Sequence, residues 1–257
     1  METSFARPFW PGQCVRFAML AVAMLLAAPV FAAAPRVLVL NDTNEPPFTT
    51  ETGDGFLDIV AREAFRRAGV ELRLVKLPAE RALLDANAGI EDGDLVRIAG
   101  LEKQYPNLIR VPEKLVDWAF TAFSKNPPIP SNWPAIRQHA VGYIKGWKIY
   151  EQNLAGTGNT IAVESSEQLF RLLALDRIDV ALYSHWMGLA LIQRQGMKDV
   201  YVLEPPLATR EMFIYLHKKH AVLAPKIASA LRALKAEGFY DRAYREKLLP
   251  YAGKFSP

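Results

Sequence analysis

The chain has 257 residues, of which 51% are apolar and 23% are charged, and its formal net charge is +4. These values are ordinary for a globular protein and allow one large or two medium domains. The weak positive charge is not gathered into a run of lysines and arginines, so we expect no nucleic-acid-binding face.

The first 32 residues have the pattern of a signal peptide. A positively charged start precedes an apolar stretch at 17–28, which is too short to span a bilayer. Val30-Phe31-Ala32 then place suitable residues at the −3 and −1 positions of a cleavage site. We therefore expect residues 1–32 to be removed and the mature protein to lie in a bacterial periplasm, with an uncleaved anchor as the alternative. Cys14 precedes the apolar stretch, so it is not a lipoprotein cysteine, and the mature chain has none.

The first hundred mature residues predict alternating strands and helices. Residues 57–68 repeat apolar side chains at helical spacing and stop at Gly69, a usual helix end. The expected order is a strand at 36–40, this helix, a strand at 70–75, a helix between Pro78 and Gly89, and a strand at 95–99. A βαβαβ order of this kind predicts a parallel sheet with helices on its faces.

Arg97 is the one charged residue in the third of these strands and lies near its carboxyl end. Ligands of open α/β sheets bind at that end of the strands. A buried guanidinium also needs an anionic or strongly polar partner. Either the protein supplies it, Glu102 being near in sequence, or a ligand does.

A second α/β series is expected after the proline-rich stretch at 126–130, which follows an aromatic strand at 118–123. Ser165 and Gln168 have the spacing of a capping box at the start of a helix. The other elements expected here are strands at 140–144, 161–163, 178–183, 200–202 and 212–216, and helices starting near Trp147, Pro225 and Tyr240.

Five stretches in this order carry a resemblance to a known family: Pro46-Pro47-Phe48, Gly55-Phe56-Leu57-Asp58, Ala88 to Asp94, Val141 to Gly146, and Ala230 to Tyr240. The chain resembles the extracytoplasmic solute-binding proteins of family 3, which include the amino-acid receptors of bacterial ABC transporters. The resemblance covers nearly all of the mature chain.

The resemblance implies an α/β, two-lobed periplasmic-binding-protein fold of type II. Each lobe would be a mostly parallel sheet flanked by helices, and two hinge crossovers would join the lobes. Lobe one would comprise residues 35–124 and 208–257, and lobe two residues 125–207. A small-molecule ligand would bind in the cleft and close the lobes by a hinge motion. We expect a monomer whose partner is an ABC-type permease or a membrane sensor.

Two departures from the family pattern bear on the ligand. The amino-acid receptors usually carry Thr-x-x-Arg after the third strand, and its arginine holds the ligand α-carboxylate; residues 101–107 contain no arginine. The family aspartate that holds the α-amino group corresponds to Ser184. An ordinary α-amino acid is therefore in doubt, unless Arg97 replaces the missing arginine, and another small polar or anionic solute becomes the expectation.

The strand-end position of Arg97 and the resemblance predict one ligand-binding cleft, made of Glu45, Phe48, Arg97, Trp118, Lys145, Gly146, Tyr183, Ser184 and His185. Arg97 would bind a carboxylate through two hydrogen bonds. Phe48 and Trp118 would sandwich an apolar or planar part of the ligand, with core packing as the alternative for both rings. The histidines lack zinc-ligand spacing, so we expect no metal and no cofactor.

The resulting functional hypothesis is a periplasmic protein that captures a small solute for a permease. A ligand sensor for a membrane receptor is the first alternative. The second is an enzyme on the same fold, like the family's periplasmic dehydratases, with Glu45 or Glu102 as general acid or base. The chain shows no nucleophile–base pair and no Gly-x-Ser-x-Gly motif, so we expect no enzyme.

If Arg97 holds the ligand, Arg97→Ala should abolish binding and leave the protein folded. Titration of the ligand into both proteins measures this, and unchanged affinity would contradict the assignment.

Overall fold

The computed structural model describes residues 1–3, 36–126 and 129–252. The apolar stretch and cleavage site of the predicted signal peptide lie outside the described residues. The compact unit described below begins at Arg36. Within the part of the chain that the structure describes, no helix has the length and apolar character needed to cross a membrane.

The predicted βαβαβ order is confirmed in the first lobe, the name used here for strands β1 to β4 and the helices packed on them. Strands β2, β1 and β3 lie side by side and are parallel. The elements are β1 (Arg36–Asp42), α2 (Phe56–Arg67), β2 (Val70–Lys76), α3 (Ala79–Ala88), β3 (Gly93–Ile98), η1 (Leu101–Lys103) and β4 (Leu108–Arg110), and near the C-terminus η2 (Lys218–Leu223), α8 (Ala224–Ala236), α9 (Phe239–Lys247) and η3 (Leu249–Tyr251).

The second lobe, the name used here for β6 to β8 and their helices, has its own parallel strands in the order β7-β6-β8. Its elements are α4 (Trp133–Ile136), β6 (Val141–Ile144), α5 (Lys148–Asn153), β7 (Thr160–Val163), α6 (Ser166–Ala174), β8 (Val180–Ser184) and α7 (His185–Gln195). The sequence did not predict α7. Residues 187–192 are buried one after another, so α7 lacks the one-sided apolar pattern of a surface helix.

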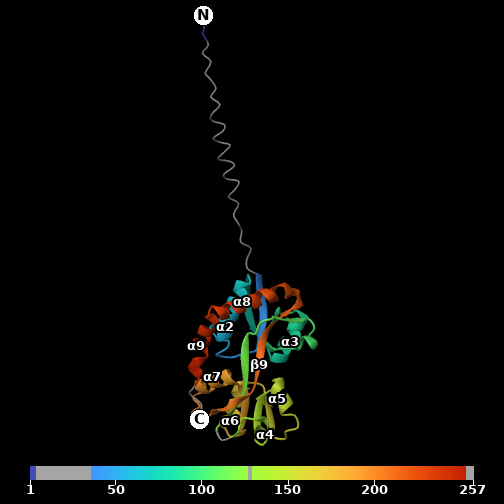
Figure 1. The fold of residues 1–257 in the computed structure, drawn as a ribbon, viewed down its shortest axis with the longest axis vertical. Helices are drawn as coiled ribbons and strands as arrows, with labels where there is room; N and C mark the ends of the chain where they lie inside the picture. Colours follow the sequence, from blue (N-terminus) through green and yellow to red (C-terminus); the bar gives the residue numbers. More distant parts are fainter. Residues whose placement is uncertain (4–35, 127–128, 253–257) are drawn as a thin grey trace. The chain divides into compact units, whose positions relative to one another are not determined.

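Two long antiparallel strands, β5 (Val116–Ser124) and β9 (Tyr201–His217), join the lobes. Figure 1 shows β9 passing from the part with α6 and α7 to the part with α2 and α8. The prediction of two separate strands at 200–202 and 212–216 was wrong. The β5–β9 pairing shifts between Leu203 and Ala208, so Pro205 and Pro206 lie where β9 makes no ladder bond and their missing N–H groups cost nothing.

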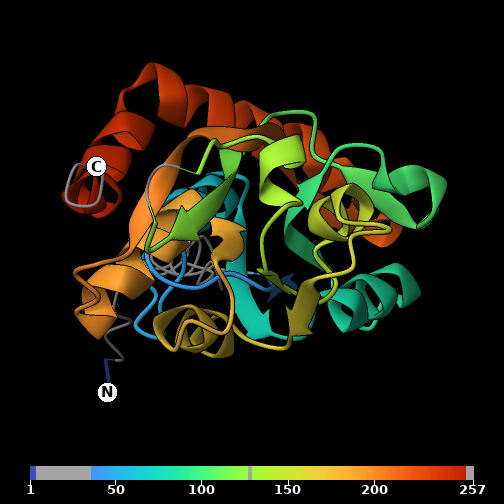
Figure 2. The ribbon, with the colours of Figure 1, turned by 90° about the horizontal axis from the view of Figure 1, so that it is seen from below.

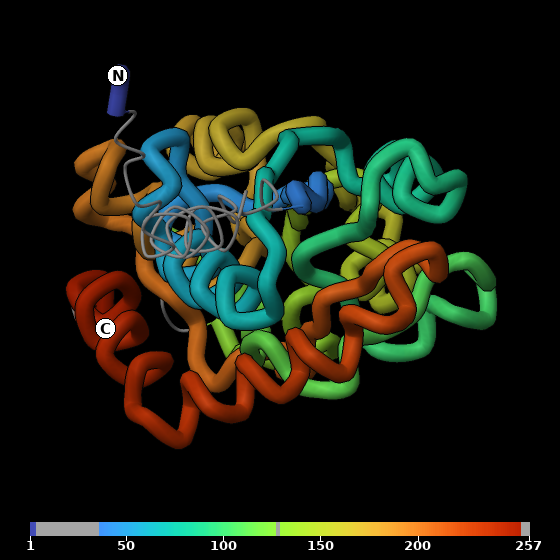
Figure 3. The backbone as a smooth tube through the Cα atoms, turned by 90° about the horizontal axis from the view of Figure 1, so that it is seen from above, coloured from blue at the N-terminus to red at the C-terminus, as the bar shows by residue number. Residues whose placement is uncertain are grey.

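The helices of the first lobe pack on two faces of its sheet. Helices α2, α8 and α9 contact one another, and their apolar residues join the main hydrophobic core. In Figures 2 and 3, α8 and α9 follow one another as the red helices. Helix α3 contacts β1 and β3 and covers a smaller apolar cluster, which contains Ala86, Leu108 and Phe213. The predicted lobe boundaries, 35–124 with 208–257 and 125–207, stay a prediction.

Gly93 marks a close approach between two central strands. A Cβ atom at this position would lie 2.1 Å from the main-chain oxygen of Tyr215 in β9. Main-chain atoms cannot move aside as a flexible side chain can, so this contact sets the spacing of β3 and β9 beside the strand end that carries Asp94.

We therefore expect Gly93→Ala to lower the free energy of unfolding by about 2–3 kcal/mol, because the methyl group forces β3 and β9 apart. Urea denaturation measures the loss. Gly158→Ala is the control, since a Cβ atom there meets nothing within 4 Å and its φ is not positive. Equal losses in both variants would contradict the close-approach explanation.

Candidate functional site

Charged side chains meet where the carboxyl ends of β2 and β1 lie beside the amino end of β3. Asp42 pairs in register with Lys76 of β2, and Asn41 pairs with Asp94 of β3. Asp42 and Asp94 are each only 1% exposed. Buried carboxylates need partners, so the contacts of these two residues decide which groups remain for a ligand.

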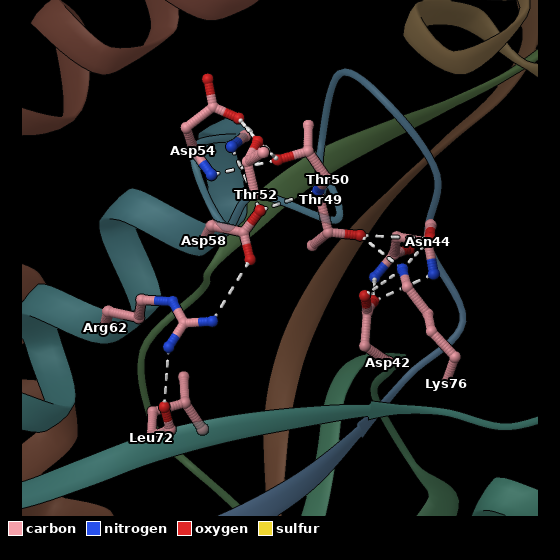
Figure 4. A network of polar contacts seen from close by, with 11 residues as sticks. Asp42, Asn44, Thr49, Thr50, Thr52, Asp54, Asp58, Arg62, Leu72 and Lys76 are labelled. Atoms are coloured by element: carbon pink, nitrogen blue, oxygen red, sulfur yellow. Dashed lines mark hydrogen bonds and ion pairs between the residues drawn. The ribbon is translucent and has the colours of Figure 1, made fainter.

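Lys76 is the partner of Asp42. Its Nζ lies 2.5 Å from Asp42 Oδ2, contacts the main-chain oxygen of Asn44 and donates to Thr49 Oγ1 at 2.8 Å. Asn44 donates its main-chain N–H to Asp42 at 2.9 Å. Figure 4 shows how these groups converge. The network fixes the loop after β1 and pairs the exposed Lys76 side chain with the buried carboxylate of Asp42.

The other end of this loop is tied to α2. Asp58 accepts hydrogen bonds from the main-chain N–H groups of Thr50 and Gly55, at 2.8 and 3.1 Å. Burial raises the pKa of Asp58 above its ordinary value. Arg62, 3.9 Å from Asp58, also donates to the main-chain oxygen of Leu72 at 3.0 Å (Figure 4). The loop is therefore held at both ends by polar contacts.

Arg97 lies near the carboxyl end of a core strand, as predicted, and its partner is Asp94. The Arg97 guanidinium lies 2.8 Å from Asp94 Oδ2 and donates to the main-chain oxygen of Ala79 at 2.9 Å. Burial raises the pKa of Asp94. Glu102 instead lies 3.7 Å from Arg110. The protein itself therefore supplies the anion, although not from the residue that the sequence suggested.

Phe48 and Trp118 stack on each other. Their ring centroids are 4.5 Å apart at an interplanar angle of 24°, and both rings are buried in the main core. The sandwich of a ligand between them is absent, because each ring fills the space beside the other. A contact of either ring with a ligand stays a prediction.

Tyr183 is fully buried at the end of β8. Its ring stacks on Trp147 with centroids 5.2 Å apart, and its main-chain oxygen accepts from Tyr150 Oη at 2.6 Å. The Tyr183 hydroxyl has no hydrogen-bond partner among the described residues. Burial, together with the charge of Glu45, raises its pKa well above the ordinary value. Tyr183 therefore brings an unpaired hydroxyl close to Glu45.

Glu45 connects the two lobes. Ser166 Oγ, on the first residue of α6, donates to Glu45 Oε2 at 2.7 Å. The Ser165 hydroxyl caps this helix by accepting from the Gln168 N–H, as predicted, but the Gln168 side chain accepts from Glu164 rather than Ser165. A carboxylate at the amino end of a helix is stabilised by the helix dipole. Glu45 therefore lies where an anion is favoured.

The remaining predicted site residues have local partners. Lys145 is exposed and lies 3.5 Å from Glu164, and the Gly146 N–H donates to Glu151 at 2.7 Å. His185, the first residue of α7, lies 3.6 Å from Glu204, and burial lowers its pKa. Ser184 is the last residue of β8 and is buried. Their roles in binding stay predictions.

A polar pocket of about 620 Å³ opens beside the network of Asp42 and Lys76. Of the predicted site residues, Glu45 alone lines it. Sequence reasoning missed Asp42, Lys76 and Arg194, which also line it. Asp42 and Lys76 are the last residues of adjacent strands and carry opposite charges, and this pattern in the sequence could have predicted their contact. Arg194 lies on the helix that the sequence did not predict.

Comparison with known proteins gives one relative by sequence and several by fold. No protein-family model matches the chain. An uncharacterized protein of Shewanella oneidensis is 29% identical over 197 residues, 72% of this chain and 73% of that protein. A histidine kinase sensor domain with similarity to periplasmic binding proteins superposes with a TM-score of 0.71 at 16% identity, over 86% of this chain and 98% of that chain. AbpA of Streptococcus pneumoniae, an amino acid ABC transporter substrate-binding protein bound to L-arginine, gives 0.69 at 14%, over 85% and 97%.

At these identities the solved structures establish the fold. The two-lobed periplasmic-binding-protein fold predicted from the resemblance is confirmed, and the resemblance to the amino-acid-binding proteins of family 3 extends to the three-dimensional structure.

The Asp94–Arg97 pair changes the result expected for Arg97→Ala. Loss of the guanidinium leaves a buried carboxylate without its cation, which costs about 3–5 kcal/mol of unfolding free energy. Adding Asp94→Asn to this variant should restore part of the loss, since the uncompensated charge is then gone. Chemical denaturation of the two single variants and the double variant measures the coupling.

Lys145→Ala is the matched control, because the Lys145–Glu164 pair is exposed and its loss should change stability by about 0.5 kcal/mol or less. An Arg97→Ala variant as stable as this control would show that the buried pair is dispensable.

Proposed function

We propose that this chain is an extracytoplasmic solute-binding protein of family 3 that captures a small polar solute between its lobes. The observation that carries the proposal is the hydrogen bond from Ser166 to Glu45, because it joins the loop after β1 to the second lobe. Beside this bond lies the buried hydroxyl of Tyr183, which has no hydrogen-bond partner among the described residues. Buried polar groups of this kind are satisfied by a partner, and a bound solute supplies one.

The contacts of the cleft support a solute other than an ordinary α-amino acid. Arg97 is already paired with Asp94, so it is not a free anchor for a carboxylate. Ser184, in the position of the family aspartate, is a buried neutral residue. Neither the arginine that holds the α-carboxylate in the amino-acid receptors nor the aspartate that holds the α-amino group is therefore replaced, by Arg97 or by Ser184, in this chain.

Delivery to an ABC-type permease from the periplasm is the role that we propose for the loaded protein. The likeness to AbpA, described as an amino acid ABC transporter substrate-binding protein, supports it. A sensor for a membrane receptor is the second candidate, favoured by the equally extensive likeness to a histidine kinase sensor domain. Binding without catalysis fits both, and Glu102, the other acid considered from the sequence, is half exposed beside Arg110.

A thermal-shift screen of the mature protein, from Ala33 onward, tests the binding role. The panel should contain amino acids, amines, dicarboxylates, aromatic acids, sugars and short peptides. A solute at 100 times its Kd adds about 2.7 kcal/mol, or roughly 5–10 °C in a protein of this size. Recovery of the solute unchanged is expected; a chemically altered product would contradict a pure binding role.

Ser166→Ala tests the cross-lobe bond with any solute found in the screen. Loss of one hydrogen bond should weaken binding by about three- to tenfold, because the closed form is less stable. Ser229→Ala, on the exposed face of α8, should leave the affinity unchanged. Equal affinities for all three proteins would show that the Glu45–Ser166 bond plays no part in closure.

A further inference from the structure

The charges around the pocket leave two carboxylates, Glu45 and Glu51, without a cationic partner among the described residues. Each cation placed there by the structure is already matched by a carboxylate within hydrogen-bonding distance. The three pairs are Lys76 with Asp42 at 2.5 Å, Arg97 with Asp94 at 2.8 Å and Arg194 with Glu167 at 3.0 Å. The surplus carboxylates are therefore Glu45 and Glu51, and Glu45 is the one that also contacts the second lobe, through Ser166.

Glu45 has no lysine, arginine or histidine nitrogen within 4.0 Å among the described residues, and its bond to Ser166 is with a neutral group. Its main chain is fixed, because its carbonyl oxygen accepts from the N–H groups of Phe48 and Thr49 at 3.0 and 3.3 Å. Thr49 in turn donates its hydroxyl to Asn44. Glu45 is therefore a negative charge presented by a rigid loop at the polar pocket.

The groups beside Glu45 are suited to a positively charged ligand. The Tyr183 hydroxyl is buried and unpaired, so it can accept a hydrogen bond from an ammonium or guanidinium N–H. The described residues that line this part of the cleft offer no unpaired cation for a carboxylate.

We propose that the cleft selects a small organic cation, an amine or guanidinium compound without a carboxylate, and that Glu45 is its counter-charge and the specificity-determining residue. This inference rests on the proposed solute-binding function and names its substrate class. A carboxylate on the ligand would have to displace Asp94, Asp42 or Glu167 from its cation. An amino acid should therefore bind more weakly than the amine that results from its decarboxylation.

Matched pairs of solutes that differ by one carboxylate test this inference: agmatine with arginine, putrescine with ornithine, and cadaverine with lysine. Calorimetric titration into the mature protein should show, for at least one pair, that the decarboxylated member binds about tenfold or more tightly than the amino acid. An amino acid that binds as tightly as its decarboxylated partner, or more tightly, in every pair would overturn the inference.

Glu45→Gln tests the counter-charge, since the amide oxygen can still accept from Ser166 while the charge is gone. Binding of the preferred amine should weaken by about tenfold or more at an unchanged melting temperature of the free protein. Glu71→Gln, an exposed change of the same kind on β2, should leave the affinity unchanged. Glu45→Gln with the affinity of the unmodified protein would overturn the role of Glu45.

Failure of this inference and failure of the proposed function give different results. A dicarboxylate, sugar or peptide that binds when all amines fail overturns the cation proposal and leaves the solute-binding function standing. If no solute of any class in the panel binds, both proposals fail.

Discussion

The pairing of β5 with β9 is the constraint on which the rest of the structure depends. These two strands carry the chain between the lobes: β9 hydrogen-bonds to β3 and β4 of the first lobe, β5 hydrogen-bonds to β8 of the second, and the two pair with each other. Their ladder is interrupted at one place, between Phe120 and Ala122, where β9 has extra residues including two prolines. An interruption of this kind bends a sheet and leaves fewer ladder bonds to distort when the lobes move. The crossing is also what brings the loop after β1 within reach of α6, and so sets the distance from Glu45 to Ser166.

At the carboxyl ends of the strands, the protein uses its charges mainly on itself. Lys76 and Arg97 lie near the carboxyl ends of β2 and β3, the two strands that flank β1, where a ligand carboxylate would be expected, yet each pairs with a buried aspartate. An unpaired carboxylate of Asp42 or Asp94 in the interior would cost several kcal/mol of folding free energy. This cost explains why each cation is paired within the protein and is not left free to bind a ligand. Asp42 and Asp94 are thereby paired within the protein, whereas Glu45 has no cationic partner among the described residues.

The sequence was sufficient for most elements of the fold, because their apolar residues recur on one face. The helix α7 was missed because it is buried all round, and β9 was divided because prolines usually end a strand. The partner of Arg97 could not be read from the sequence either. In a regular strand, residues three apart face opposite sides, but the pairing of β3 with β9 shifts between Asp94 and Arg97 and so permits their contact.

For the candidate site, the sequence predicted Glu45 and Tyr183 as cleft residues, and the structure places Tyr183 in the core close to Glu45. Ser166 was not singled out, since the sequence predicted only a helix start capped by Ser165, and the contact of Ser166 with Glu45 depends on how the two lobes meet. Phe48 and Trp118 were recognised as neighbours of the cleft, but only the structure shows that they stack on each other. Pairings between distant segments are set by tertiary packing, which local patterns do not encode.

The stacked tryptophans also give the molecule an optical property. Trp118 lies against Phe48 on the crossover strand, and Trp147 lies between Tyr150 and Tyr183 at the inner side of the second lobe. Trp118 is sealed from water, whereas Trp147 is half-buried. The emission of an indole ring depends on its exposure to water. The fluorescence of Trp147 will therefore follow the hydration of its surroundings while that of Trp118 stays constant, and the half-buried Trp133 and Trp186 add a second solvent-sensitive signal.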